Sequence, residues 1–304
     1  MKILITGGLG KIGSRLCESL SQTCDIVILD NFSNNSKIVN CARIIRGDIR
    51  DHKIVDNLVS KVDIVIHMAA QISVDKSIDN PIYDADNNIN GTLNVLEASK
   101  RYNIKRFIYM SSAAVYGKPI YLPIDEKHPT NPMSSYGLSK LTGERYSMLY
   151  HDLYGLPVTC LRLFNIFGFQ NSDDSYSGVI TKFIDRVKNN KNPIIFGDGN
   201  QTRDFIYVND VINVISETIE NKDAIGEIIN VGTGEPTKIV NLSDTIIKIF
   251  DKKLITEFVP PKIGDIRDSY ADITKMKNIL GYEPKYSLEQ GLVRLIKNDV
   301  ETIE

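Results

Sequence analysis

The chain has 304 residues, of which 42% are hydrophobic and 24% are charged, and its 36 basic residues against 38 acidic ones give a net charge of −2. Disorder is therefore not expected, and the evenly spread charge offers no basic surface for nucleic acid. No apolar stretch reaches the roughly 18 residues that a membrane helix needs and no signal-peptide pattern opens the chain, so we expect a cytoplasmic protein that does not contact a membrane.

The first element has the pattern of a dinucleotide-binding turn. An apolar run at residues 2–6 is followed by Gly7, Gly10 and Gly13 and then by a helical pattern. Glycines let the backbone approach a pyrophosphate, which the free N–H groups at the helix N-terminus attract. An ordinary glycine-rich turn is the simpler explanation for such a match in isolation.

The second element supports the dinucleotide interpretation. A strand-like run at residues 25–30 ends at Asp30, seventeen residues after Gly13. A carboxylate at this position can accept hydrogen bonds from the adenosine ribose hydroxyls. It would also repel a 2′-phosphate, so we expect NAD rather than NADP, although Lys37 and Arg43 lie nearby in the sequence.

Further strand-like runs predict the fold class. They lie at residues 42–48, 62–70, 104–112, 158–165 and 227–232, with helical patterns between the early ones. This alternation predicts an α/β fold with a doubly wound, mainly parallel sheet of about seven strands, whose carboxyl ends hold the ligands. We expect a Rossmann-like NAD-binding domain at residues 1–165 and a smaller substrate-binding lobe at 166–304, from which a strand near 226–233 returns to the first sheet.

Cysteine and histidine positions favour neither disulfides nor a metal site. The residues are Cys17, Cys24, Cys41, Cys160, His52, His67, His128 and His151. None of the cysteines has a CxxC spacing, and the histidines are scattered without a ligand pattern. We therefore expect reduced thiols and no bound metal.

Tyr136 and Lys140 lie four residues apart in a stretch with a helical pattern. Residues at i and i+4 share one helix face, so the phenol and the ammonium can converge on one substrate atom. We expect the cation to lower the pKa of the phenol and so to make a base of the tyrosine. In isolation, the same spacing is more common in ordinary surface packing.

Eight motifs occur in one order along the chain: TGGLGKIGS, HMAA, NINGTLNVLEA, MSSAAVYG, YGLSK, LRLFNIFG, GDGNQTRDFIYVNDV and GDIRDSYADITKMKNILGYEP. Together they resemble the extended short-chain dehydrogenases, specifically the NAD-dependent sugar-nucleotide epimerase/dehydratase group, from about residue 3 to about residue 292. The resemblance implies that NAD is bound by Gly7, Gly10, Lys11, Ile12, Gly13, Asp30, Asn31, Asp48, Ile49, Ala69, Ala70, Asn88, Ser111, Tyr136 and Lys140. Without it, Asp48 would be interpreted as a turn residue and Asn88 as a helix cap.

The resemblance also implies the reaction. Ser112 lies where the family has a hydroxyl that bonds the reacting sugar oxygen, so Ser112, Tyr136 and Lys140 are the expected catalytic residues. Related 4,6-dehydratases have an acid and a base at the next two positions, where this chain has Ala113 and Ala114. Methyl groups cannot transfer protons. Related decarboxylases commonly keep a glutamate in this stretch, so its absence also counts against that reaction, less decisively. The implied activity is 4-epimerisation of a UDP-hexose through a 4-keto intermediate, with Tyr136 as the base.

A UDP-sugar site is likewise implied, formed by Ser73, Ser112, Asn165, Val179, Phe183, Ile195, Phe196, Gly197, Arg203, Lys262, Asp265 and Ser269. An ion pair with Asp204 is the alternative role for Arg203. Lys262 stands where the family usually has an arginine, and Arg267 is a candidate to share its role. Ser269 stands where some relatives have a bulky tyrosine, so we expect room for the acetamido group of UDP-N-acetylglucosamine.

Two other activities and one binding role stay open. The activities are epimerisation of UDP-glucuronate and reduction of a sugar nucleotide, and the binding role is that of a non-catalytic dinucleotide sensor. Relatives also pair as homodimers through a four-helix face, to which residues 82–101 and 135–154 correspond. The outer faces of these helices look no more apolar than an ordinary surface.

Overall fold

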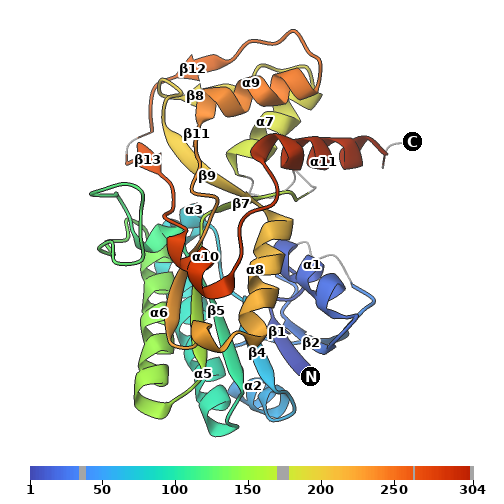
Figure 1. Cartoon of the computed structure of the whole chain (residues 1–304), viewed down its shortest axis with the longest axis vertical. Coiled ribbons are helices and arrows are strands. Elements are labelled where there is room, and N and C mark those ends of the chain that lie inside the picture. Colours follow the sequence, from blue (N-terminus) through green and yellow to red (C-terminus); the bar gives the residue numbers. More distant parts are fainter. Residues whose placement is uncertain (34–38, 170–177, 263, 302–304) are drawn as a thin grey trace.

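Seven parallel strands form the main sheet in the computed structural model, which describes residues 1–33, 39–169, 178–262 and 264–301 (Figure 1). The strands are β1 (Lys2–Thr6), β2 (Asp25–Asp30), β3 (Arg43–Arg46), β4 (Ile64–His67), β5 (Arg106–Ser112), β6 (Val158–Leu163) and β10 (Glu227–Val231). Their order in the sheet is β3-β2-β1-β4-β5-β6-β10. The predicted doubly wound α/β fold is confirmed, and β10 returns to the first sheet beside β6 as expected.

Helices cover both faces of this sheet because side chains alternate along each strand. Ile3 and Ile5 of β1 belong to one hydrophobic core and Leu4 to the other. The face of Leu4 is covered by α2 (His52–Val59), α5 (Gly91–Arg101) and α6 (Ser135–Tyr154). The opposite face is covered by α1 (Lys11–Leu20), α8 (Val208–Glu220) and α10 (Thr274–Leu280). The second part of the chain thus supplies the helices α8 and α10 and the strand β10 to the main sheet and the helices that cover it.

A smaller lobe stands on the carboxyl ends of the strands (Figure 1). It contains a four-stranded sheet of β7 (Asn165–Phe167), β9 (Thr202–Tyr207), β11 (Pro236–Lys238) and β13 (Asp268–Ser269), and a two-stranded sheet of β8 (Ile194–Phe196) and β12 (Glu257–Val259). Its helices are α7 (Val179–Lys188), α9 (Ile239–Ile249) and α11 (Leu288–Glu301). Short helical turns lie at Ala113–Val115 and Lys222–Ala224.

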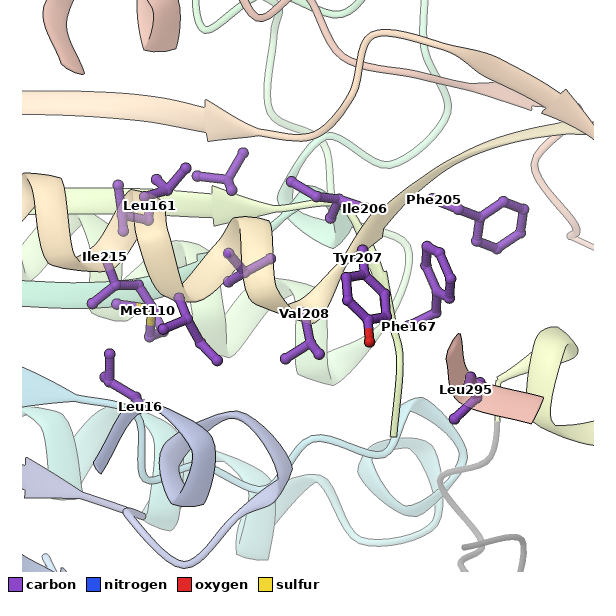
Figure 2. Close-up of a cluster of buried hydrophobic side chains, with 14 of the residues drawn as sticks. Leu16, Met110, Leu161, Phe167, Phe205, Ile206, Tyr207, Val208, Ile215 and Leu295 are labelled. Atoms are coloured by element: carbon purple, nitrogen blue, oxygen red, sulfur yellow. The ribbon is translucent and has the colours of Figure 1, made fainter. Parts of the chain in front are cut away.

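One hydrophobic core joins the lobe to the main sheet. Figure 2 shows this core running from Leu16 and Met110 past Tyr207 to Phe205 and Leu295. All five side chains are buried. Because buried apolar side chains of both parts pack in one cluster, the lobe is held in place over the strand ends.

The helix expected at residues 82–101 is divided into three pieces. After α3 (Val74–Asp79), α4 (Pro81–Ala85) leads into a π-helical segment at Asp86–Asn90 and then into α5. The wider turn of a π segment is frequent at functional sites. In the described ranges, no helix combines the length and the apolar character needed to cross a bilayer, and no group of His, Cys, Asp or Glu side chains there could hold a metal ion.

Candidate active site

A cavity of about 1350 Å³ lies between the carboxyl ends of the strands and the smaller lobe. The expected residues that line it are Gly7, Gly10, Lys11, Ile12, Gly13, Asp30, Asn31, Ile49, Ala69, Ala70, Ser111, Ser112, Tyr136, Lys140, Asn165, Val179, Phe183, Ile195, Phe196, Arg203, Lys262 and Asp265. The fold therefore brings residues from both ends of the chain to one site. Five expected residues do not border it: Asp48, Ser73, Asn88, Gly197 and Ser269.

The glycine turn after β1 has no room for side chains and leaves a helix end open. Gly7 has φ +68°, and a Cβ there would lie 2.8 Å from the backbone of Ala69. A Cβ on Gly13 would lie 2.7 Å from the Gly7 carbonyl oxygen. No side chain caps α1 at Gly10. Free N–H groups at a helix N-terminus that the backbone can approach closely are what a pyrophosphate requires, so these residues fit NAD.

Asp30 is fixed at the end of β2 with its carboxylate at the cavity. Its Oδ2 accepts the Leu9 N–H at 3.0 Å and its Oδ1 accepts the Phe32 N–H at 2.9 Å. Each oxygen keeps a further lone pair for a ribose hydroxyl. Of the two cations considered for a 2′-phosphate, Lys37 lies outside the described residues. Arg43 pairs in register with Val27, three positions before Asp30.

Asp48 and Asn88 do not border the cavity, and both form hydrogen bonds within the protein. Arg50 donates to both carboxylate oxygens of Asp48 at 2.8 and 2.9 Å, and this contact lowers the pKa of Asp48 to about 2. The Asn88 amide is buried, where its Oδ1 accepts the Gln71 N–H at 2.8 Å and its Nδ2 donates to Ser139 Oγ at 3.0 Å. It ties the π-helical segment to α6 rather than capping a helix.

The other three residues that do not border the cavity have structural roles in the backbone around it. Ser73 caps α3, accepting the Lys76 N–H at 3.2 Å. Gly197 has φ +89° and turns the chain after β8, where its N–H donates to Val259 at 2.8 Å. Ser269 lies in β13, in register with Arg203 of β9. Each is adjacent to residues that do line the cavity.

The start of α6 positions Tyr136 against Ser112. Ser134 caps the helix by accepting the Gly137 N–H at 3.0 Å. A Cβ on Gly137 would lie 2.7 Å from the Ala114 carbonyl oxygen, so only glycine lets α6 approach the end of β5 this closely. The Tyr136 N–H donates to Ser77 Oγ at 3.0 Å. Tyr136 and Ser112 both line the cavity, and the Ser112 hydroxyl acts to lower the pKa of the phenol.

The pKa of Tyr136 is raised, which corrects the expectation drawn from its spacing to Lys140. Burial is the main cause, the Ser112 hydroxyl opposes it, and the Asp84 charge adds to it. Burial also lowers the pKa of Lys140 to about 8. The Lys140 ammonium lies 4.4 Å from the centroid of the Tyr109 ring, which stabilises its charge. Both side chains therefore carry their protons at neutral pH in this structure.

Two buried acids behind this pair were not predicted. Asp84 Oδ1 accepts from Gln71 at 2.9 Å and from Asn88 at 3.2 Å, whereas its buried Oδ2 has no partner among the described residues. Glu144 accepts from Arg162 at 2.6 and 3.0 Å and from Ser111 at 2.7 Å. The sequence did offer a signal for each acid, because each lies four residues from a predicted site residue: Glu144 from Lys140, and Asp84 from Asn88.

In the smaller lobe, Arg203 faces the cavity and forms its ion pair with Asp265, not with the adjacent Asp204. Arg203 Nη2 donates to Asp265 Oδ1 at 2.7 Å. Asp204 is fully buried and accepts from the N–H groups of Thr233, Gly234 and Ala271 at 2.8, 2.9 and 3.1 Å. The alternative ion pair between adjacent residues is therefore excluded.

Two further cations of the lobe differ in position. The Lys262 ammonium lies 4.6 Å from the centroid of the Phe196 ring on the cavity wall. Arg267 instead forms a two-point ion pair with Asp198 at 2.7 and 3.0 Å and does not line the cavity. Asn165 lines it too and donates to the Asp204 carbonyl oxygen at 3.0 Å. The loop from Phe169 to Gly178 lies mostly outside the described residues.

Comparisons with known proteins agree with this geometry. The model of the NAD dependent epimerase/dehydratase family matches residues 3–232. A provisionally named UDP-glucose 4-epimerase of Methanocaldococcus jannaschii is 42% identical over 299 residues, which cover 97% of each chain.

Two solved structures share the whole fold. The UDP-glucose 4-epimerase of Thermotoga maritima with UDP-glucose is 34% identical, has a TM-score of 0.95 and is covered completely in both chains. The UDP-N-acetylglucosamine 4-epimerase of Methanobrevibacter ruminantium in complex with UDP-N-acetylmuramic acid is 32% identical, with a TM-score of 0.93 and coverage of 99% of this chain and 98% of that one.

Proposed function

This chain belongs to the NAD-dependent epimerase/dehydratase family and is a nucleotide-sugar 4-epimerase that uses NAD, and we propose that its substrates are UDP-glucose and UDP-galactose. The observation that carries the proposal is that Tyr136 and Ser112 line one cavity, with Ala113 and Ala114 directly after Ser112 in the chain. One proton-transferring tyrosine without a second acid or base supports reversible oxidation at a single carbon.

Tyr136 is the proposed base. The phenol carries its proton in this structure, and the positive charges of bound NAD and of Lys140 would favour the phenolate, which takes the proton from the sugar O4 while Ser112 holds that oxygen by a hydrogen bond. NAD, when bound, would supply the acceptor and donor of the C4 hydride. Lys140, with a pKa of about 8, keeps most of its charge at neutral pH and lines the same cavity as Tyr136. The same phenol returns the proton when the 4-keto sugar has turned to present its other face.

The smaller lobe is suited to holding the nucleotide while the hexose turns. Val179, Phe183 and Phe196 provide apolar walls for a base. Arg203 and Lys262 provide the charge for a diphosphate on the same surface. We propose that Arg203 exchanges its partner Asp265 for phosphate oxygens, since that carboxylate is 41% exposed and the pair is weakly held.

We also propose that UDP-N-acetylglucosamine is accepted. Ser269 does not border the cavity, so its small side chain gives this extension no direct support. The likeness to the Methanobrevibacter ruminantium enzyme supports it instead.

A homodimer through α6 is a further proposal. Leu138, Leu149 and Leu153 on α6 are 56%, 44% and 62% exposed, and Ile82 of α4 is 81% exposed. Residues at these spacings follow one helix face, which is more apolar than the sequence pattern alone indicated. Symmetric pairing of two copies would bury it.

The test is turnover of a panel of UDP-sugars without added NAD, with products identified by NMR. Conversion of UDP-glucose to UDP-galactose supports the proposal and also shows resident NAD. Turnover of UDP-glucuronate with no change in UDP-glucose would overturn it. Separate arms with the acetamido sugar test the wider substrate range, and sedimentation of the wild type against Leu149→Glu tests the dimer.

A further inference from the structure

Two buried charged groups behind the proposed catalytic residues lack a hydrogen-bonded counter-ion among the described residues. Asp84 of α4 is 1% exposed, and both donors to its Oδ1 are neutral amides, those of Gln71 and Asn88. Its Oδ2 accepts no hydrogen bond from the described part of the chain. Lys140 of α6 is 4% exposed, and its ammonium lies 4.4 Å from the centroid of the neutral Tyr109 ring. Buried charges of this kind are unfavourable unless an opposite charge lies near them.

The second buried acid near Lys140 is already neutralised. Glu144 lies one turn after Lys140 on α6 and is 0% exposed, but Arg162 donates to both of its carboxylate oxygens at 2.6 and 3.0 Å. The opposite charges of such a pair largely cancel at a third group. Of the two acids that act on the Lys140 ammonium, Asp84 is therefore the one that keeps an uncompensated charge.

The other titratable groups around Lys140 in the described part of the chain are uncharged at neutral pH. Burial raises the pKa of the Cys160 thiol on β6 and of the Tyr109 phenol on β5, and it lowers the pKa of the His67 imidazole on β4 to about 3. The Tyr136 phenol on α6 also keeps its proton. A neutral group cannot balance an ammonium charge.

A shared hydrogen-bond network connects Asp84 to the turn of α6 that carries Tyr136 and Lys140. Helix α4 packs against α6. The Asn88 Nδ2 that donates to Asp84 also donates to Ser139 Oγ at 3.0 Å, and Ser139 Oγ donates to the Tyr136 carbonyl oxygen at 3.1 Å. Burial dominates two pKa values, lowering that of Lys140 and raising that of Asp84, and each charge opposes the shift of the other. Asp84 itself does not line the cavity, so it can act only through this turn.

We propose that Asp84 is a positioning residue for the epimerisation, whose buried carboxylate is the counter-charge that holds the Lys140 ammonium at the cavity in its charged form. This inference rests on the proposed function, because it takes the charge of Lys140 to favour the phenolate of Tyr136. Without Asp84, the ammonium loses its proton at a lower pH, and Tyr136 then loses the cation that favours its ionisation. The Asp84 charge also opposes the phenolate directly, so its removal moves the whole pH range of activity toward acid.

The experiment follows the titration of Lys140 in the NAD-loaded protein by NMR of carbon-13-labelled lysine, with Lys140→Met to identify the resonance. Asp84→Asn keeps an acceptor oxygen but removes the charge. Asp86→Asn is the matched control, because Asp86 is an acid two residues later whose side chain is 43% exposed. In the same proteins, kcat for UDP-glucose is measured against pH.

For Asp84→Asn, the titration midpoint of Lys140 should fall by about one pH unit, and kcat on the alkaline side of its pH profile should fall about tenfold. Both quantities should keep their wild-type values in Asp86→Asn, since water and salt screen an exposed charge. A Lys140 midpoint that does not move in Asp84→Asn, or that moves equally in Asp86→Asn, would overturn the proposal. A shifted midpoint with an unchanged pH profile of kcat would overturn the role in the reaction.

A reciprocal measurement covers the case in which Asp84→Asn does not fold. The coupling between two charges is mutual, so Lys140→Met should raise the titration midpoint of the Asp84 carboxyl group by about one pH unit. That resonance is followed in protein with carbon-13-labelled aspartate. An Asp84 midpoint that is the same in the wild type and in Lys140→Met would overturn the proposal.

Failure of the proposed function is a separate outcome. The NMR titrations need no turnover, so they decide whether Asp84 is the counter-charge of Lys140 even if no UDP-hexose is converted.

Discussion

The sheet side and the lobe side of the cavity hold similar ion pairs in different surroundings. Glu144 and Arg162, beneath the proposed catalytic residues, are 0% and 2% exposed, and Asp198 and Arg267 of the lobe are 52% and 58% exposed. In both pairs a guanidinium meets two carboxylate oxygens. Water screens the exposed pair, whereas loss of one partner from the buried pair would leave a charge without compensation.

This difference matches what each side has to do. The sheet side must hold Tyr136 and Ser112 in register with a sugar atom through repeated turnovers. On the lobe side, Arg203 must break its ion pair with Asp265 when a diphosphate binds. Because the contacts on the sheet side are buried, they stay fixed. The contacts on the lobe side are exposed, so their partners can be exchanged.

The largest expected effect is on the sheet side, at the phenol. Tyr136→Phe should lower kcat about 10³- to 10⁴-fold, because general base catalysis contributes on that order. UDP affinity should stay at the wild-type value, since the nucleotide contacts lie on the lobe side. Steady-state kinetics and calorimetry measure the two quantities. A variant with kcat near that of the wild type would remove Tyr136 as the base.

The second effect compares the two ion pairs directly. Glu144→Gln should lower the free energy of unfolding by ~3–5 kcal/mol, because the buried Arg162 loses its counter-charge. Asp198→Asn is the matched change on the exposed pair and should leave the urea midpoint unchanged. Equal losses of stability in both variants would contradict the contrast between the two sides.

The third effect is a pH dependence that arises from Lys140. Its pKa is lowered from 10.5 to about 8 in the fold. Between these values the unfolded chain holds a proton that the folded chain has lost, so the contribution of this residue to stability rises with pH. Relative to the wild type, Lys140→Met should therefore be more stable at pH 7 than at pH 10, by on the order of 1–3 kcal/mol.

Urea unfolding of both proteins at the two pH values measures this difference. A difference between the two proteins that does not change with pH would show that Lys140 keeps its ordinary pKa.

The fourth effect is on the lobe side. Arg203→Lys keeps the charge but loses the planar fork, so KM for the UDP-sugar should rise about tenfold while kcat stays within about twofold. A fall in kcat with an unchanged KM would mean that Arg203 acts on the reacting carbon and not on the nucleotide.

The smallest effect is expected at Arg267. This residue does not line the cavity, and its ion pair is exposed. Arg267→Ala should change neither KM nor the melting temperature beyond experimental error. A tenfold rise in KM would instead restore Arg267 as a diphosphate contact and weaken the assignment to Arg203 and Lys262.

Most of the fold was predictable because its signals are local. Each strand of the main sheet is a short apolar run, and the glycine turn needs only the spacing of Gly7, Gly10 and Gly13. The return of β10 to the first sheet was predictable for the same reason. The π-helical segment at Asp86–Asn90 had no such signal, since residues 82–101 have an ordinary helical pattern.

The site was less predictable where a role depends on a distant partner. Glu144 of α6 was not predicted because its partner Arg162 lies on β6, eighteen residues away. Gln201 belongs to the motif GDGNQTRDFIYVNDV, but the bond that its side-chain N–H donates to the Phe196 carbonyl oxygen was not predictable from that motif. Such contacts form between segments that no periodicity relates, so only the assembled fold reveals them.

The pairing of β10 with β6 has a consequence for making pieces of this protein. Sixty-three residues separate the end of β6 at Leu163 from the start of β10 at Glu227. During synthesis, β6 therefore stays an unpaired edge strand until much of the lobe has been made. Unpaired edge strands tend to form hydrogen bonds with strands of other chains. A fragment that stops at residue 165 would keep that edge permanently and should aggregate, so cofactor binding is best studied on a chain that extends beyond Val231.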